Sequence, residues 1–252
     1  MTPDLAVGRL FLEARGAPGA FLVGVTGAHY YGFPSPDSDL DLKGVHVAPT
    51  RDVVSLKPPP DSFDHLGLFE GVEIDYTSHE LGTALRLLLK GNGNILERIL
   101  SPWQLLDSAA AGELRALAGR TVSQKFLHHY RGFLGRACRD FRAAQPPTVK
   151  GLLYAYRSGL TGIHLLRTGE CVGDVRVLAP VYGFDRVPEL VARKAGSREH
   201  GVLADAAGFE ADLERLERTL QDAAARSPLP LEATSADELN EFLIRMRKER
   251  FA

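Results

Sequence analysis

The sequence predicts a mixed α+β fold, in which a small β-sheet domain flanked by helices (residues 1–105) is followed by an all-α domain (residues 106–252). Before Trp103, short apolar runs show the two-residue alternation of strands. After Trp103, apolar residues recur with the longer spacing of amphipathic helices. This change of period indicates a sheet layer followed by a helical layer.

The first part of the chain contains short elements separated by Gly and Pro. A helix is expected over residues 5–14, because its apolar residues have helical spacing and Gly16-Ala17-Pro18 ends it. Strands are expected over residues 21–25, 40–47 and 72–77, the last paired with residues 66–69. Two short helices, over residues 79–90 and 94–100, are separated by the turn Gly91-Asn92-Gly93.

The second part is predicted to consist of long helices. They cover residues 123–143, 149–167, 209–226 and 236–250. Pro146-Pro147, a Gly/Pro-rich stretch over residues 169–188, and Pro228 to Pro230 separate them.

Composition excludes several classes of protein. The 252 residues are 44% hydrophobic, which is ordinary for a globular protein and excludes a disordered chain. A formal net charge of -2 excludes attraction of the whole protein to nucleic acid or an anionic membrane, so nucleic-acid contact requires a local patch. Four charged residues interrupt the first fifteen positions, and no later stretch has membrane-spanning length, so we expect a cytoplasmic protein without membrane contact. Cys138 and Cys171 match no metal-ligand spacing and are expected to be reduced, partly buried thiols.

Two aspartates near the start of the second strand form the main candidate site. Asp39 and Asp41 alternate with Leu40 and Leu42, so their carboxylates share one face with Cα atoms roughly 6.5–7 Å apart. Like charges this close raise each other's pKa, and a divalent cation that binds both removes the conflict. The pair therefore predicts a metal site, and carboxylates at this spacing can hold two ions in phosphoryl-transfer chemistry.

A third carboxylate is expected from the strand over residues 72–77. Its alternation places Glu73 and Asp75 on one face, and either can reach the same site from a neighbouring strand. We favour Asp75, with Glu73 as the alternative. Lys43 continues the acid face and is expected either to meet a phosphate or to pair with Asp41.

A glycine turn precedes these acids. The strand over residues 21–25 ends near Thr26-Gly27-Ala28, so the N–H groups that follow can point at a phosphate. Thr26 and Ser38 carry hydroxyl groups that can supply a further phosphate contact.

These motifs carry a resemblance to a known family. The glycine turn, Ser38-Asp39-Leu40-Asp41 and the later strand Asp resemble the DNA polymerase beta superfamily of nucleotidyltransferases. The closer similarity is to the bacterial predicted nucleotidyltransferases associated with RNA repair. The resemblance extends from about residue 20 to about residue 175. Further positions that support it are Gly32, Gly44-Val45, Lys90 to Asn94, Leu96-Glu97, Lys150, Tyr154, Tyr156, Arg157, Leu166, Gly169 and Glu170.

The resemblance implies a magnesium-dependent transferase, with two Mg²⁺ ions (Mn²⁺ as a substitute) bound by Asp39, Asp41 and Asp75. A nucleoside triphosphate such as ATP would donate its nucleoside monophosphate to a hydroxyl and release pyrophosphate. We favour an RNA or tRNA end as acceptor; a protein side chain or a small alcohol suits the same core. One departure concerns Ala28, because the superfamily typically has a serine there whose hydroxyl contacts the triphosphate.

The helical part carries candidate binding residues of two kinds. Lys150, Tyr154 and Arg157 follow an i, i+4, i+7 spacing on one helix face, which suits triphosphate or base binding but equally a mixed surface stripe. The helix over residues 123–143 carries four arginines that form either an RNA-binding patch or an ordinary solvated face, namely Arg131, Arg136, Arg139 and Arg142. Two alternative functions stay open: a nucleotide or RNA sensor with weak catalysis, and an antitoxin-like interaction protein.

Overall fold

The computed structural model describes residues 2–196, 201–203 and 205–251 and confirms the mixed α+β fold. Its described residues form two compact units. The sheet unit comprises residues 2–27, 39–121 and 233–251, and the helical unit comprises residues 28–38 and the described part of 122–232. The chain therefore passes between the units next to Gly27 and next to Asp39. Each unit is made of several separate segments of the chain, whereas the sequence predicted two consecutive domains that meet at residue 105. That boundary stays a prediction.

The sheet has five strands in the order β3-β4-β2-β1-β5. The strands are β1 Ala20–Val25, β2 Leu40–His46, β3 Ser62–Phe69, β4 Val72–Glu80 and β5 Gln104–Leu106. β2 and β4 pair in parallel, whereas the other neighbours are antiparallel. The three main predicted strands are present, but β4 is longer than predicted. It continues to Glu80, whose side chain accepts a hydrogen bond from Gly82 N and so begins the next helix.

One face of the sheet is covered by α1 (Leu5–Arg15). The side chains of Phe11 and Leu12 pack against alternate residues of the central strands, among them Val23, Leu42 and Tyr76. Successive side chains of a strand point to opposite faces, so Leu22 and Val45 lie on the other face of the sheet. There α4 (Leu81–Leu89) and α5 (Gly93–Leu100) lie against β2. The sheet is thus covered on both faces, and β1 carries apolar residues throughout, whereas β2 and β4 also carry the charged residues Asp41, Lys43 and Asp75.

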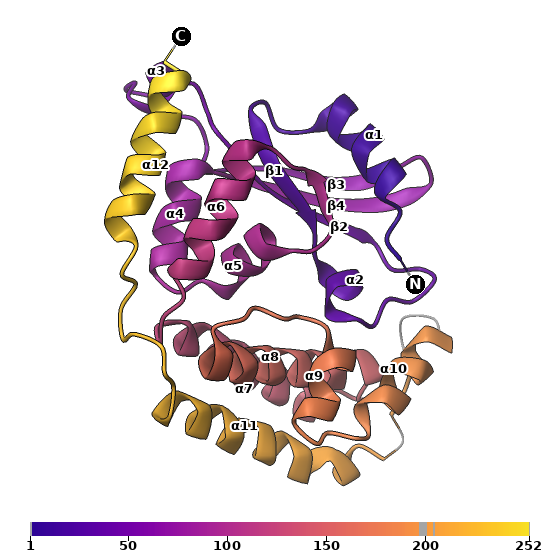
Figure 1. Ribbon diagram of the computed structural model, residues 1–252. Helices are drawn as coiled ribbons and strands as arrows, with labels where there is room; N and C mark the ends of the chain where they lie inside the picture. The colour runs from indigo at the N-terminus through magenta and orange to yellow at the C-terminus, as the bar shows by residue number, and fades with distance from the viewer. Residues whose placement is uncertain (1, 197–200, 204, 252) are drawn as a thin grey trace. The chain divides into compact units, whose positions relative to one another are not determined.

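The end of the chain belongs to the sheet unit. Helix α12 (Ala236–Glu249) contacts α4 and α6 (Ala109–Arg120), and Figure 1 shows it in yellow beside α4. Arg247 forms an ion pair of 2.6 Å with the buried Glu80, and Arg250 O accepts a hydrogen bond from Thr50 N at the short helix α3 (Thr50–Val53).

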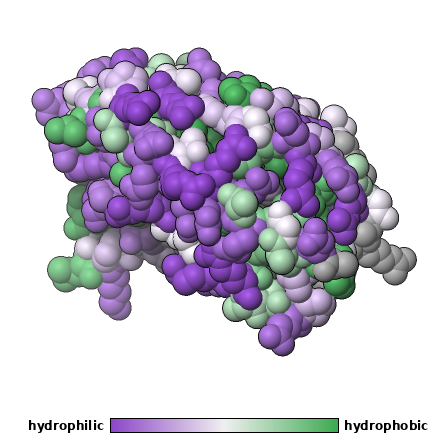
Figure 2. Space-filling model, turned by 90° about the horizontal axis from the view of Figure 1, so that it is seen from below, coloured by the Kyte–Doolittle hydropathy of each residue, from purple (hydrophilic) through white to green (hydrophobic). Residues whose placement is uncertain are grey.

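The helical unit is built around α8 (Val149–Thr168), which is buried on most sides. It packs against α7 (Phe126–Ala143) and α11 (Glu210–Ala225). Two helices that the sequence did not predict, α9 (Val175–Val181) and α10 (Val187–Gly196), also contact α8, and a 3-10 turn spans Ala207–Phe209. Figure 2, seen from the side of α11, shows a mainly hydrophilic surface with small separate hydrophobic areas.

Two further observations concern the predictions from composition. Across the described ranges, every helix is too short or too polar to cross a membrane. Cys138 is buried and Cys171 is partly buried, and both are free thiols as predicted.

Candidate functional site

The structure places Asp41 and Asp75 side by side on the two parallel central strands. The β2–β4 register pairs Asp41 with Asp75 and Lys43 with Thr77, so these side chains share one face of the sheet. Asp41 is 18% exposed and Asp75 is 39% exposed at the side chain. The register between β2 and β4 begins at Leu40 and Ile74, so it pairs Asp75, and not Glu73, with Asp41.

Lys43 lies between these two carboxylates. Its ammonium nitrogen is 2.7 Å from Asp75 Oδ1 and 3.9 Å from Asp41 Oδ1. The same nitrogen donates a hydrogen bond of 3.3 Å to the carbonyl oxygen of Asp75. The lysine thus neutralises part of the repulsion between two acids on adjacent strands. The sequence suggested a pair with Asp41, and the structure adds the shorter contact with Asp75.

The glycine turn is held against Asp41. Gly27 has a φ of +62°, which L-residues rarely adopt, and a Cβ built there would lie 1.6 Å from Asp41 Oδ2. Thr26 N also donates a hydrogen bond of 2.9 Å to Asp41 O, and the Thr26 side chain is buried. Only glycine at position 27 leaves room for the observed position of the Asp41 carboxylate.

Asp41 and Asp75 carry the type of ligand atom that a hard cation prefers, but the described residues do not form a cluster of three such ligands. Carboxylate oxygens are the ligands that Mg²⁺ prefers, and Asp41 and Asp75 already share one cationic group, Lys43. Asp39 immediately precedes β2 and is partly buried. Within the described part of the chain, no group of three or more His, Cys, Asp or Glu side chains is placed to hold a metal ion. The structure therefore brings together two of the three predicted carboxylates, Asp41 and Asp75, and the metal site stays a prediction.

Ser38 and Ala28, two other predicted nucleotide-binding residues, lie in the helical unit. Ser38 Oγ accepts a hydrogen bond of 2.9 Å from Ser35 N, which closes a local turn. The buried Lys194 donates a hydrogen bond of 3.0 Å to Ser35 Oγ. Ala28 is buried in the apolar core of this unit together with Phe33.

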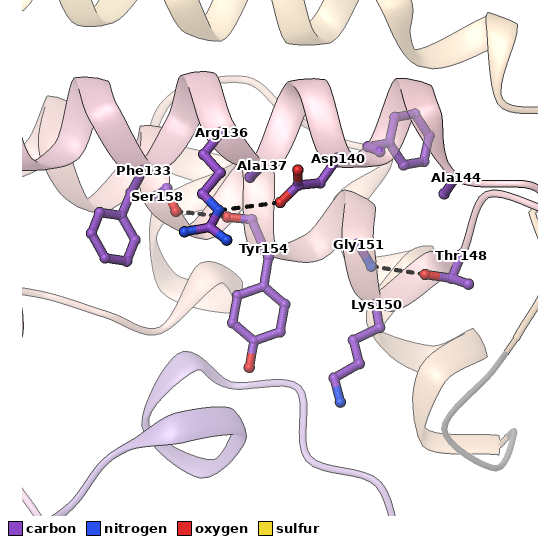
Figure 3. Close-up of a pocket in the computed structure, with 11 residues that line it drawn as sticks. Phe133, Arg136, Ala137, Asp140, Ala144, Thr148, Lys150, Gly151, Tyr154 and Ser158 are labelled. Atoms are coloured by element: carbon purple, nitrogen blue, oxygen red, sulfur yellow. Dashed lines mark hydrogen bonds and ion pairs between the residues drawn. The ribbon is translucent and has the colours of Figure 1, made fainter.

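The predicted face of α8 divides into two parts. Lys150 and Tyr154 line a cavity beside α7, and in Figure 3 both side chains extend from α8 to the same side. Arg157 is only 2% exposed, and its guanidinium carbon lies 3.9 Å from the centre of the Tyr31 ring. Tyr154 has edge contacts with Tyr31 and Phe33, at centroid distances of 6.1 and 5.5 Å. Sequence reasoning missed these two aromatic partners, although the run Tyr30-Tyr31-Gly32-Phe33 was a visible signal.

A buried polar pair beneath the acid face was also missed. Arg98 Nη1 donates hydrogen bonds of 2.8 Å to Gly44 O and 2.7 Å to His79 Nδ1. Burial, with the charge of Arg98 as the second cause, lowers the pKa of His79 to about 4. His79 is therefore neutral at pH 7 and accepts the arginine hydrogen bond. Nearby, Asn92 caps α5 by accepting a hydrogen bond from Ile95 N.

Comparison with models of protein families shows which family the chain belongs to. The model of the RNA repair pathway DNA polymerase beta family, RlaP, matches residues 19–245. The chain belongs to this family. Membership confirms the resemblance found in the sequence, and family and fold together indicate a DNA polymerase beta-type nucleotidyltransferase.

Two curated relatives of this RlaP family member match only part of the chain. An uncharacterized protein of Methanocaldococcus jannaschii is 31% identical over 153 residues, which are 60% of this chain and 61% of that protein. The uncharacterized protein YcgL of Bacillus subtilis is 26% identical over 136 residues, 52% of this chain and 50% of that protein. The chain thus spans less than two thirds of each of these relatives. A nucleotidyltransferase-like protein from Exiguobacterium sibiricum superposes with a TM-score of 0.36 and 10% identity, over 99% of this chain and 81% of that one.

Proposed function

We propose that the protein transfers a nucleoside monophosphate from a nucleoside triphosphate to a hydroxyl group and releases pyrophosphate. The observation that carries the proposal is the pairing of Asp41 with Asp75 across β2 and β4, with Gly27 against the Asp41 carboxylate. Membership of a DNA polymerase beta-type family supports this reaction class. We propose an RNA or tRNA end as the acceptor, and the RNA repair pathway in the family description supports RNA.

In this proposal Asp39, Asp41 and Asp75 hold two Mg²⁺ ions, for which Mn²⁺ can substitute. When bound, such ions lower the pKa of the acceptor hydroxyl and neutralise the charge of the triphosphate. Asp75, which is the more exposed carboxylate of the pair, would accept the proton of the acceptor hydroxyl. Lys43 would leave the carboxylates when a metal binds and would then contact a phosphate.

The remaining proposed nucleotide contacts come from backbone and side chains. Thr26, Gly27 and Ala28 would present backbone groups to the triphosphate, with Ser38 as a hydroxyl donor. Lys150 and Tyr154 would contact phosphate and base. Arg157 would act through Tyr31, because its guanidinium is buried against that ring.

A transfer assay tests the proposal. The wild-type protein is incubated with Mg²⁺ and each of the four α-labelled triphosphates, against RNA, protein and small-alcohol acceptors. We expect label transfer with the wild type, and its loss by at least a thousandfold in Asp41→Asn with an unchanged circular dichroism spectrum. A fully active Asp41→Asn protein would rule out this mechanism.

A second candidate function is a nucleotide sensor with weak catalysis. It is favoured by the Lys43 ammonium between the two acids and by the alanine at position 28, which lacks the hydroxyl typical of the superfamily. Calorimetry with a nonhydrolysable triphosphate and Mg²⁺ separates the two functions. Tight binding without transfer to any acceptor would establish the sensor.

A further inference from the structure

A buried lysine of the helical unit donates a hydrogen bond to the turn that precedes Asp39. Lys194 on α10 is 3% exposed, and its Nζ lies 3.0 Å from Ser35 Oγ. The same nitrogen lies 5.8 Å from the centre of the buried Phe33 ring. Lysines are rarely buried to this degree unless hydrogen bonds or charges hold the ammonium group. The bond to Ser35 is one of the contacts that hold Lys194.

The turn over residues 35–38 contains two serines whose side chains touch. Ser38 N donates a hydrogen bond of 3.0 Å to Ser35 O, and Pro36 occupies the second position of the turn, where proline is favoured. Ser35 N donates to Ser38 Oγ at 2.9 Å, and the two hydroxyl oxygens are 3.1 Å apart. Lys194 and both serines belong to the helical unit. A chain of hydrogen bonds thus connects the lysine to Ser38 through Ser35.

The surroundings of the two hydroxyl groups determine which of them donates. An ammonium group only donates, so Ser35 Oγ accepts a hydrogen bond from Lys194. If Ser35 accepted from Ser38 as well, its own hydroxyl hydrogen would have no acceptor among the described residues, although Ser35 is 1% exposed. A buried donor without an acceptor is strongly disfavoured. Ser35 therefore donates its hydroxyl hydrogen to Ser38.

This direction limits what Ser38 can offer to a ligand. Its hydroxyl oxygen accepts from the N–H and from the O–H of Ser35, which uses both lone pairs. The hydroxyl hydrogen of Ser38 then remains for a ligand, and the side chain is partly exposed. Ser38 can therefore donate to an acceptor such as a phosphate oxygen, but it cannot accept from a donor.

We propose that Lys194 is a positioning residue, which acts through Ser35 to keep the Ser38 hydroxyl oriented as a donor to the triphosphate. The choice of a triphosphate rests on the proposed nucleotidyl transfer. These three residues, here called the serine relay, supply a hydroxyl donor in a chain that has a buried alanine at position 28. The ammonium group at one end polarises both hydroxyl groups, because hydrogen bonds that run in one direction strengthen each other.

The test measures binding of tripolyphosphate to the full chain by calorimetry in the presence of Mg²⁺. Tripolyphosphate carries the phosphate chain that all four nucleoside triphosphates share, so the identity of the base does not matter. We expect the wild type to bind it, Ser38→Ala to weaken binding at least tenfold, and Lys194→Met to weaken binding at least fivefold. Arg193→Met removes the neighbouring exposed cation of α10 and should change the affinity less than twofold.

A double variant separates action through Ser38 from a general loss of structure. If Lys194 acts through Ser38, adding Lys194→Met to Ser38→Ala should weaken binding less than twofold further. A further fivefold loss would show that the lysine acts independently of Ser38 and would overturn the proposal. Absence of tripolyphosphate binding by the wild type would overturn it as well.

Ser35→Ala interrupts the serine relay without removing the lysine. This variant keeps the test decisive if circular dichroism shows that Lys194→Met does not fold. We expect Ser35→Ala to weaken tripolyphosphate binding at least fivefold in the wild type and less than twofold in the Ser38→Ala background. Unchanged affinity in Ser35→Ala alone would refute the relay.

The proposed function and the serine relay can fail separately. Binding of tripolyphosphate that depends on the relay, in a wild-type protein that transfers no nucleotide to any acceptor, would refute nucleotidyl transfer alone. Normal transfer by the wild type, with the same KM for the triphosphate in Lys194→Met and Ser38→Ala, would refute the relay alone.

Discussion

Lys43 donates a hydrogen bond of 2.7 Å to Asp75 on the neighbouring parallel strand, and its ammonium group is also 3.9 Å from Asp41. A single protein cation thus lies between the two carboxylates proposed to bind metal. Because two cations cannot share this position, a metal ion must displace the lysine before it can bind both acids. The lysine therefore competes with the metal in the proposed site.

We predict that Lys43→Met tightens binding of Mn²⁺. The substitution keeps the unbranched stem of the side chain and removes the competing charge, so about tenfold tighter binding, or about 1.4 kcal/mol, is expected. Electron paramagnetic resonance titration measures free Mn²⁺ directly. Lys57→Met, an exposed residue of the sheet unit, is the control and should leave the affinity unchanged. Weaker Mn²⁺ binding in Lys43→Met would show that the lysine supports the metal site.

Gly27→Ala should displace Asp41 and abolish transfer. The added Cβ would lie 1.6 Å from Asp41 Oδ2, and the φ of +62° is itself unfavourable for alanine. Gly71→Ala is a matched control, because Gly71 has a φ of +79° and nothing within 4 Å of the added Cβ. The control should cost about 1 kcal/mol of unfolding free energy, and Gly27→Ala at least about 2 kcal/mol, as measured by urea denaturation. Equal costs would show that the carboxylate moves away freely.

Ala28→Ser should destabilise the protein without tightening nucleotide binding. Ala28 is 8% exposed within the apolar core of the helical unit, so a hydroxyl there loses contact with water. The expected cost is about 1 to 2 kcal/mol. Thermal unfolding and triphosphate calorimetry measure the two effects, with the exposed Ala143→Ser as control. Tighter triphosphate binding at unchanged stability would instead place this side chain at the nucleotide.

Arg247→Ala should destabilise the sheet unit much more than Arg245→Ala. Arg247 pairs with Glu80 where the two side chains are only 15% and 8% exposed, so its loss leaves a buried carboxylate without its cation. We expect a loss of about 2 kcal/mol or more. Arg245 pairs with Glu113 at 49% and 45% exposure, and its loss should cost less than about 1 kcal/mol. Urea denaturation compares the two variants, and equal losses would contradict the burial argument.

The stability of the protein should decrease as the pH falls below about 6.5, in part because of His79. Burial lowers its folded-state pKa to about 4, whereas the unfolded chain retains the ordinary value of 6.5. Between these values the unfolded state binds the proton first, so this contribution is fully present above pH 6.5 and is lost progressively down to pH 4.

The variant His79→Asn isolates this contribution. Asparagine keeps an acceptor for Arg98 and removes the titrating ring. Thermal unfolding from pH 7.5 to pH 4.5 should therefore decline less steeply in the variant than in the wild type. Parallel curves would show that other groups cause the acid sensitivity.

Local sequence patterns were sufficient for the main strands, the long helices and the face shared by Asp41 and Lys43. These features depend on the spacing of apolar residues along the sequence, which can be read from the sequence directly. The sequence favoured Asp75 over Glu73 without defining a register, and only the folded sheet shows that the parallel pairing of β2 and β4 places Asp75 opposite Asp41. Strand β5, with three residues, is too short to carry a periodic signal.

Other features depend on contacts between residues distant in sequence. Arg157 had the spacing of an exposed ligand, yet it is buried because Tyr31, far earlier in the chain, provides an aromatic face for its guanidinium. Helix α9 lies where Gly and Pro predicted irregular chain, and α10 lies mostly beyond that stretch, where no element was predicted. At α9, packing against α8 outweighs the local preference.

The return of α12 to the sheet unit limits how this protein can be divided for experiments. Its contacts with α4 and α6, and the ion pair of Arg247 with Glu80, stabilise a unit whose other residues end at position 121. A fragment covering residues 1–121 would therefore expose the apolar side chains that Leu239 and Phe242 now cover, and would tend to aggregate. To isolate the sheet unit, residues 28–38 and 122–232 should each be replaced by a short linker, so that α12 remains attached.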